Sequence, residues 1–296
     1  MAVELGLLLL LATLWGASYT FIKLGVATIP PITLIAARTS VAGLLLLAIM
    51  HARGLSLPRD RATWRRFFFQ ACLNSVIPWT LIAWGESFVD AGLATMLNSA
   101  SPIFAFLLTA AVTQHEKVSL RKLVGVVAGM AGICLIVGVD AIHGIGRGLA
   151  AEIAIVAATI CYACAAIFGQ NFRGLDPMAP AAGSLLAGAA LLIPASLVVE
   201  RPWTLAPSMA SLAALLGLAV ISTALAFVIY FRLIQTLGSV GTTAQAYLRV
   251  PIGVALGVMF LGESLSPTTW VGLACVIGGV AAMTIPAKAL SAPRIA

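Results

Sequence analysis

The chain contains 296 residues, of which 61% are apolar and 9% are charged, and its mean hydropathy is +1.08. Soluble domains average roughly 45–50% apolar and about 25% charged residues, so this composition excludes a soluble enzyme, a secreted disulfide scaffold and a disordered regulator. The formal net charge of +7 is explained by basic cytoplasmic loops, and we expect a lipid bilayer, not nucleic acid, as the partner.

Ten apolar segments are long enough to cross a bilayer, which takes about 20 helical residues. The first begins without a basic region, so we expect a spanning helix and not a signal peptide. The longest connection, about residues 51–66, is a basic strap. We predict an all-α integral membrane protein with ten transmembrane helices at about 4–22, 31–50, 67–85, 91–113, 121–139, 149–169, 178–199, 211–232, 239–261 and 267–286.

The basic residues indicate how these helices are oriented. With ten spans, the termini and the connections after the second, fourth, sixth and eighth spans share one side, which carries twelve Lys and Arg residues. The other side carries three (Lys23, Arg147 and Arg201), and Arg38 and Arg249 inside the spans complete the seventeen. Because cytoplasmic loops are enriched in basic residues, we predict that both termini are cytoplasmic.

A shift of 147 residues aligns the two halves of the chain. It places Trp15 over Tyr162 and Glu116 over Glu263, and a further slip of two residues brings Pro102 over Pro251. Five helices per half is an odd number, so the halves must insert with opposite orientations, as in many secondary transporters. We therefore predict two inverted five-helix repeats, residues 1–140 and 148–288, around a central cavity.

Ionisable groups lie at the ends of the predicted spans. All ten acidic residues and the three histidines are at span ends or in loops, whereas proton- and sodium-coupled carriers usually place such a group at mid-membrane. Facilitated movement down a gradient is the simpler prediction, and proton coupling through Glu86 or Glu263 is the alternative. The five cysteines lie within apolar segments, so we expect no metal and no cofactor.

Two arginines lie inside predicted spans. Arg249 is near the middle of segment 239–261, where an arginine is costly unless it is paired or hydrated. One hypothesis is that it binds a substrate carboxylate in a water-filled cavity. The alternative is a structural role, in which it caps carbonyls near Pro251 or reaches Glu86. For Arg38, nearer a span end, we favour a structural role, either snorkelling outward or pairing with an acid.

Segment 91–113 has one polar face that includes Thr95, Asn98 and Ser101 at helical spacing. It also contains Pro102, which removes a backbone hydrogen bond. Pro251 repeats the arrangement in the second half, and paired interruptions of this kind point to a transport site. We predict that Pro102 and Pro251 act as hinges beside that site.

Aromatic and polar side chains within the spans complete the predicted site. Deep aromatic rings can stack on an organic solute, and amides and hydroxyls supply hydrogen bonds, Thr223 among them. The predicted substrate-binding residues are Trp15, Tyr19, Asn74, Trp79, Asn98, Ser101, Tyr162, Ser222, Tyr230, Gln245, Tyr247 and Arg249.

Segments 121–139 and 267–286 are almost wholly apolar and rich in glycine. Small residues let membrane helices approach closely. We assign these two segments no substrate role and expect either a peripheral buttress or a contact between copies in a homo-oligomer.

Several stretches resemble the EamA-type branch of the drug/metabolite transporter superfamily. They are Leu14-Trp15-Gly16-Ala17-Ser18-Tyr19, Pro31-Ile32-Thr33, Ala91-Gly92-Leu93-Ala94, Asn98-Ser99-Ala100-Ser101-Pro102 and Leu261-Gly262-Glu263. The first half departs from the family pattern, with Gln114-His115-Glu116 where Leu-Gly-Glu is typical. The resemblance covers nearly the whole chain. It implies a ten-helix basket around a central cavity, with segments 121–139 and 267–286 outside, and export of small metabolites from a bacterial inner membrane.

We therefore expect a secondary transporter that exports small metabolites, amino acids first among them, by alternating access. The alternatives are an efflux carrier for drugs, sugars or nucleotide derivatives, and an intramembrane enzyme. The sequence contains no H-E-x-x-H, no G-x-S-x-G and no paired mid-membrane aspartates. Neither a metal site nor an activated nucleophile is therefore expected, and we predict that the protein is not an enzyme.

Overall fold

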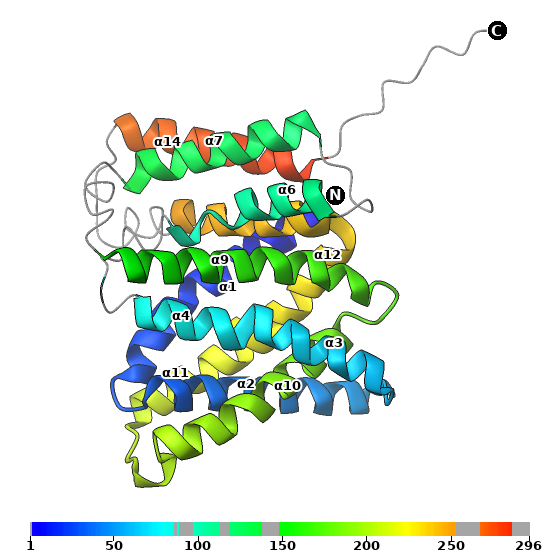
Figure 1. Cartoon of the computed structure of the whole chain (residues 1–296), viewed down its shortest axis with the longest axis vertical. Coiled ribbons are helices and arrows are strands. Elements are labelled where there is room, and N and C mark those ends of the chain that lie inside the picture. Colours follow the sequence, from blue (N-terminus) through cyan, green and yellow to red (C-terminus); the bar gives the residue numbers. More distant parts are fainter. Residues whose placement is uncertain are drawn as a thin grey trace, which may run out of the picture.

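The computed structural model describes residues 2–85, 88, 97–112, 119–137, 148–252 and 267–285, with the backbone alone at Tyr19, Thr20, Lys23, Ala83, Val112, Val137 and Thr269. Within these ranges every regular element is helical, and the helices lie in stacked layers (Figure 1). The first half contains α1 (Ala2–Val26), α2 (Pro31–Ala52), α3 (Arg61–Ala71), α4 (Ile77–Gly85), α6 (Ser101–Val112) and α7 (Leu120–Val137). The second contains α9 (Leu149–Phe168), α10 (Met178–Val199), α11 (Met209–Ala219), α12 (Ala226–Thr243) and α14 (Pro267–Thr284).

Long apolar helices confirm the prediction of an all-helical membrane protein. Four stretches are long and apolar enough to cross a bilayer: Pro31–Ala52, Leu149–Phe172, Met178–Val199 and Met209–Thr243. Shorter apolar helices occur at Ala2–Ser18, Ser101–Ala111 and Trp270–Thr284. Parts of the predicted spans 91–113 and 239–261 lie outside the described residues. The count of ten spans, the two repeats and their inversion remain predictions.

Helix α3 begins at Arg61, earlier than the predicted start near residue 67. Asp60 is its N-cap residue, and the carboxylate of Asp60 accepts a hydrogen bond of 2.8 Å from the backbone N–H of Thr63. This bond satisfies one of the free donors of the first turn and lowers the pKa of Asp60. Part of the basic strap predicted as a loop is therefore helix.

Two π-helical segments and one glycine interrupt the long helices. The segment η1 (Cys72–Val76) joins α3 to α4, and η4 (Val220–Leu225) joins α11 to α12. Within α12, Gly238 has φ 77° and ψ −179°, a conformation that glycine adopts without strain. The helix therefore breaks at Gly238 and resumes at Ser239, where a separate span was predicted.

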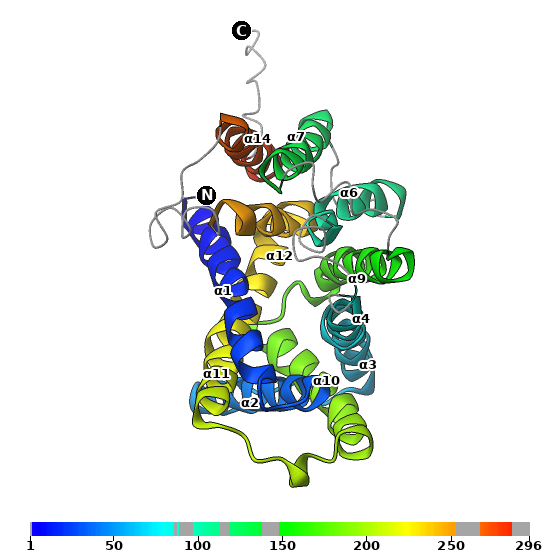
Figure 2. The same ribbon diagram turned by 90° about the vertical axis from the view of Figure 1, so that its left-hand side faces the viewer.

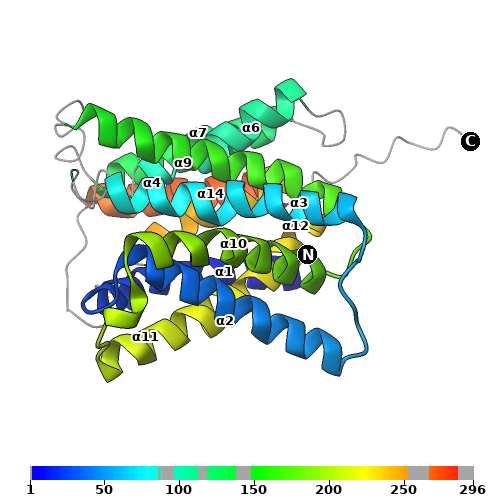
Figure 3. The ribbon, with the colours of Figure 1, turned by 60° about the horizontal axis from the view of Figure 1, so that its bottom comes forward.

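Helices from the two halves of the chain pack against one another. Helix α2 runs beside α10, and α4 runs beside α9 (Figures 1 and 3). At one end of α2 this packing includes hydrogen bonds, because the Glu200 carboxylate accepts the backbone N–H groups of Ile32 at 3.0 Å and Thr33 at 2.6 Å. The first turn of α2 is thus held by the residue that follows α10.

Helices α7 and α14 form a separate outer layer (Figure 2). The two helices approach each other most closely at glycine residues. A Cβ added to Gly132 would lie 2.6 Å from the carbonyl oxygen of Gly272, and a Cβ added to Gly279 would lie 2.6 Å from the carbonyl oxygen of Gly125. The expected close packing through small residues is therefore a contact between these two helices of one chain. A contact between copies remains untested.

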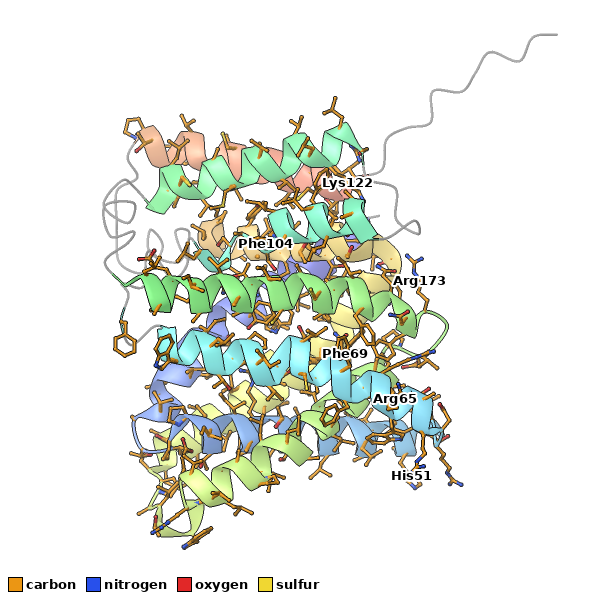
Figure 4. All side chains as sticks on the ribbon, in the orientation of Figure 1. His51, Arg65, Phe69, Phe104, Lys122 and Arg173 are labelled. Carbon is orange, nitrogen blue, oxygen red and sulfur yellow. The ribbon has the colours of Figure 1, made fainter. Side chains whose placement is uncertain are left out.

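Basic residues gather at one end of the helix layers. Figure 4 shows His51, Arg65, Lys122 and Arg173 at the right-hand end of the molecule. The start of α1 is tied to Arg232 through Glu4, with 3.5 Å between the charged atoms. These residues belong to the connections and the terminus that were predicted to share the cytoplasmic side.

Candidate functional site

A cavity of about 530 Å³ opens between helices of both halves of the chain. Small-molecule sites commonly enclose about 300–1,000 Å³, so this cavity is large enough for a metabolite. Its walls come from α1, α2, η1, α4, α6, α9, α11, α12 and the helical residues 97–98 and 245–252. Nine of the predicted site residues line it: Trp15, Asn74, Trp79, Asn98, Ser101, Tyr162, Tyr230, Gln245 and Arg249.

Arg249 faces this cavity from the helical stretch 245–252. Its Nε donates a hydrogen bond of 2.9 Å to the Oε1 atom of Gln245, one helical turn earlier. The guanidinium carbon lies 5.2 Å from the centroid of the Trp15 ring, within the range of a cation–π interaction. The structure thus places Arg249 at a cavity, as the first of the two hypotheses requires.

Arg38 lines the same cavity from α2, and its side chain does not follow the sequence-based interpretation. It is 4% exposed, so it does not snorkel outward. Its Nε donates a 2.6 Å hydrogen bond to the Thr223 hydroxyl, and its Nη2 a longer one of 3.5 Å to the Ser222 carbonyl. Arg38 is therefore bound by two neutral oxygen atoms and not by an acidic side chain among the described residues. Its guanidinium carbon lies 4.0 Å from the centroid of the Trp79 ring.

An aromatic cluster forms one wall of the cavity. The ring of Phe227 lies 6.4 Å from those of Trp15 and Trp79, and the Tyr230 ring lies 5.6 Å from Trp15, measured between centroids. Trp15 and Tyr162, which the 147-residue shift aligns, both line the cavity. The wall therefore gives an organic solute a broad apolar surface next to two guanidinium groups.

One π-helical segment lines the cavity, and the other holds one of its arginines. Asn74 comes from η1, and Thr223, which holds Arg38, comes from η4. Shifting η1 by the 147 residues that align the halves moves it to 219–223, which overlaps η4. The Nδ2 group of Asn74 is buried and has no hydrogen-bond partner among the described residues, so it can donate to a ligand. Such π turns occur often at functional sites.

Three predicted site residues are not among those that line the cavity. Tyr247 is fully buried against α7, where its ring contacts Gly129 and its hydroxyl donates to the Val126 carbonyl at 3.1 Å. The Ser222 side chain is likewise buried outside the lining, although its carbonyl accepts from Arg38. The side chain of Tyr19 lies outside the described residues.

The predicted hinge prolines are placed differently from each other. Pro102 follows a turn at Ser99–Ala100, close to Ser101 in the cavity wall. Pro251 continues the helical stretch 245–252, and within the described residues the nearest turn is at Ala244. The two prolines therefore correspond in sequence, but the backbone around Pro102 differs from that around Pro251. Movement about these prolines stays a prediction.

Sequence reasoning missed three polar residues of the wall: Ser18, Arg38 and Thr243. Ser18 follows Trp15 at helical spacing, and that spacing was the available signal. Its hydroxyl donates to the Trp15 carbonyl at 2.7 Å. The partner of Arg38 is 185 residues away in the sequence, so no local pattern could have revealed this pairing.

Several known proteins resemble this chain along nearly all of its length. The "Uncharacterized inner membrane transporter YedA" of Escherichia coli (strain K12) is 28% identical over 297 residues, covering 98% of this chain and 95% of its own. The "Probable terminal-alkyne amino-acid exporter" of Streptantibioticus cattleyicolor is 26% identical, covering 92% and 90%. The "Probable amino-acid metabolite efflux pump" of E. coli (strain K12) is 23% identical, covering 93% and 92%.

A solved crystal structure and a family model agree with this likeness. The crystal structure superposes with a TM-score of 0.78 at 19% identity, covering 96% of this chain and 99% of the other, which shows a common fold. The model of the EamA-like transporter family matches twice, at residues 3–138 and 149–285, and so covers both halves. Because the family model matches both halves of the chain, this protein belongs to the EamA-like transporter family.

Proposed function

We propose that this transporter exports small metabolites, amino acids first among them, across the bacterial inner membrane by alternating access. The observation that carries the proposal is Arg249, a guanidinium group placed in a cavity of metabolite size. Its Nε is engaged by Gln245, which leaves the two Nη groups for a carboxylate. An arginine and a carboxylate form a bidentate pair that sets both affinity and orientation.

The rest of the cavity suits the remainder of an amino acid. The ring cluster of Trp15, Trp79, Phe227 and Tyr230 offers apolar surface to a side chain, and Asn74 offers an amide donor. The names of two relatives, an amino-acid exporter and an amino-acid metabolite efflux pump, favour the same substrate class. Efflux of another class of metabolite is the alternative.

The proposed mechanism is facilitative, with the two halves rocking about the Pro102 and Pro251 region. The wall residues within the described part of the chain include no carboxylate and no histidine, so no proton-carrying group faces the substrate there. The segment η1 contributes Asn74 to the wall, and η4 and the break at Gly238 interrupt helices that contribute other wall residues, so non-standard backbone is available for this movement. In this proposal both termini face the cytoplasm.

The first experiment is uptake of labelled amino acids by liposomes that contain the purified protein, without any proton or sodium gradient. Saturable uptake above that of empty liposomes is expected. If folded protein moves no amino acid, but an imposed proton gradient restores transport, the facilitative mechanism is wrong. If neither condition gives transport, amino acids are the wrong substrate class.

A second experiment separates a carrier from a channel. Single cysteines placed near Asn98 are labelled with a membrane-impermeant reagent applied from one face of the liposome or from the other. Alternating access predicts that substrate increases labelling from one face and decreases it from the opposite face. Simultaneous access from both faces would indicate a channel.

A further inference from the structure

We propose that Arg38 is a second anion-binding group of this cavity and that the preferred substrate carries two anionic groups. This inference rests on the proposed function, because it names the substrate class of the same site. The sequence-based interpretation gave Arg38 a structural role, and among the described residues no acid holds its guanidinium group.

The donors of Arg38 are only partly used. A guanidinium group has five N–H donors. In the described structure Nε of Arg38 donates to Thr223, and Nη2 makes one long contact of 3.5 Å to the Ser222 carbonyl. Nη1 has no hydrogen-bond partner among the described residues, and the side chain lines the cavity. The two terminal nitrogens therefore form an open fork that matches a carboxylate.

Arg249 is arranged in the same way. Its Nε donates to Gln245, and its two terminal nitrogens have no hydrogen-bond partner among the described residues. Each arginine is therefore oriented by one side-chain oxygen at Nε and supported by one tryptophan, Trp79 or Trp15. Two independent helices, α2 and the stretch 245–252, present the same chemical group to one cavity.

The charge of the cavity favours a substrate with net negative charge. Among its described wall residues, Arg38 and Arg249 are the two charged side chains, and the others are apolar or neutral polar groups. Two guanidinium groups inside apolar membrane helices are costly without counter-charge. A substrate with one carboxylate and one ammonium group brings no net charge, whereas a second carboxylate supplies the charge that balances Arg38.

The ammonium group of an amino acid gains little in this cavity. Carboxylates and aromatic ring faces are the usual partners of an ammonium ion. No carboxylate is present in the described wall, and two of its five aromatic rings, those of Trp79 and Trp15, already lie next to guanidinium groups. We therefore infer that acidic amino acids and dicarboxylates are bound more tightly than neutral amino acids of the same size.

The test compares glutamate with glutamine, because the two differ by one charge and hardly in shape, and adds glutarate, which lacks the ammonium group. Dissociation constants are measured by calorimetry on the purified full-length protein in detergent. We expect glutamate to bind about tenfold or more tightly than glutamine, the effect of one charge-assisted pair. Glutarate is expected to bind at least as tightly as glutamate.

Variants assign the preference to Arg38. Arg38→Gln is expected to bring the affinity for glutamate down to that for glutamine and to leave the affinity for glutamine within about twofold. Arg38→Lys keeps the charge but loses the fork, so part of the preference should remain. The matched control is Arg65→Gln, an exposed arginine on α3 outside the cavity, which should change neither constant.

The outcomes separate this inference from the proposed function. Equal affinities for glutamate and glutamine in the wild-type protein would overturn it, while binding of either would still support amino-acid transport. An equal loss for both ligands in Arg38→Gln would make Arg38 a structural residue. The wild-type comparison decides the question of charge even if the variants do not fold. If no amino acid and no dicarboxylate binds to folded protein, the inference and the proposed amino-acid substrates both fail.

Discussion

The guanidinium carbon of Arg38 lies 4.0 Å from the centroid of the Trp79 ring. Stacking on a tryptophan face stabilises a cation that has left water, and the effect grows as the pair is desolvated. The Thr223 hydroxyl fixes the same guanidinium at Nε, and that hydroxyl in turn donates to the Leu218 carbonyl at 2.7 Å. Among the described residues, this buried arginine is thus held in one orientation by an aromatic face and a hydroxyl, without an acidic partner.

The first prediction concerns this aromatic face. Trp79→Leu should weaken binding of an anionic substrate by about 2- to 30-fold, which corresponds to the ~0.5–2 kcal/mol of a cation–π pair. Trp79→Phe should retain part of the affinity, because a smaller aromatic face remains. The measurement is the dissociation constant for glutamate, and Trp84→Leu, on the exposed side of the same helix α4 (46% exposed), is the control. If Trp79→Leu and Trp79→Phe lose the same affinity for glutamate, Trp79 contributes through the shape of the cavity and not through a cation–π interaction.

The second prediction concerns Arg249. Arg249→Ala should abolish uptake of amino acids, since the α-carboxylate then loses the fork that Gln245 orients. Arg249→Lys should recover part of the activity at most, because a single ammonium group cannot form a bidentate pair. Uptake into liposomes is measured next to the melting temperature of each variant.

The control for Arg249 is Arg232→Ala, which removes an exposed arginine from α12 at the end of the bundle. It should leave uptake unchanged. Normal uptake by a folded Arg249→Ala variant would remove Arg249 from the binding site and return it to the structural role.

The sequence predicts the fold well because the membrane imposes a simple rule. A spanning segment must be apolar over about 20 residues and must bond its own backbone, so apolar length marks the helices directly. Helix α3 begins inside the predicted strap because Asp60 caps its first turn, and this hydrogen bond is visible only in the structure. Breaks such as η1 and η4 leave no comparable signal, because polar pairs such as their Asn74-Ser75 and Ser222-Thr223 also occur in regular membrane helices.

The site was harder to predict, because a deep polar or aromatic residue faces either the cavity or a neighbouring helix. Tyr247 and Gln245 are two positions apart on one helix, yet Gln245 lines the cavity and Tyr247 packs on Gly129 of α7. Only the packing of α7 decides which side of that helix is buried. Arg38 was misjudged for a similar reason: its partner Thr223 comes from the other half of the chain.

The third prediction concerns the contact between Glu200 and the start of α2. The carboxylate accepts the N–H groups of Ile32 and Thr33 and the Thr33 hydroxyl at 2.7 Å, and the negative charge lies at a helix N-terminus, where it is favourable. Glu200→Gln removes the charge and one acceptor, so the protein should lose about 1–3 kcal/mol of stability. The melting temperature in detergent should fall accordingly.

The control for Glu200 is Glu4→Gln. Glu4 forms a 3.5 Å ion pair with Arg232, whose side chain is 50% exposed, and exposed pairs contribute little. The melting temperature should therefore change less in this variant. If the two variants melt alike, the bonds at the start of α2 do not contribute more than an ordinary surface pair.

The fourth prediction compares two consecutive glycines of α14. A Cβ at Gly279 would lie 2.6 Å from the carbonyl oxygen of Gly125 and 2.7 Å from the backbone nitrogen of Gly129, whereas a Cβ at Gly278 would meet nothing within 4 Å. Backbone atoms of α7 cannot move aside as a flexible side chain can, so Gly279→Ala should separate α7 from α14 and cost about 1–3 kcal/mol.

Gly278→Ala adds the same methyl group to the same helix on its open side. Alanine is the better helix former by about 0.5–1 kcal/mol, so the melting temperature of this variant should stay constant or rise. The two changes are identical in composition and differ only in the helix face. Equal melting temperatures for both variants would mean that the close approach of α7 and α14 does not stabilise the protein. A Gly279→Ala variant that melts early but still transports would confirm that this outer layer supports the cavity without lining it.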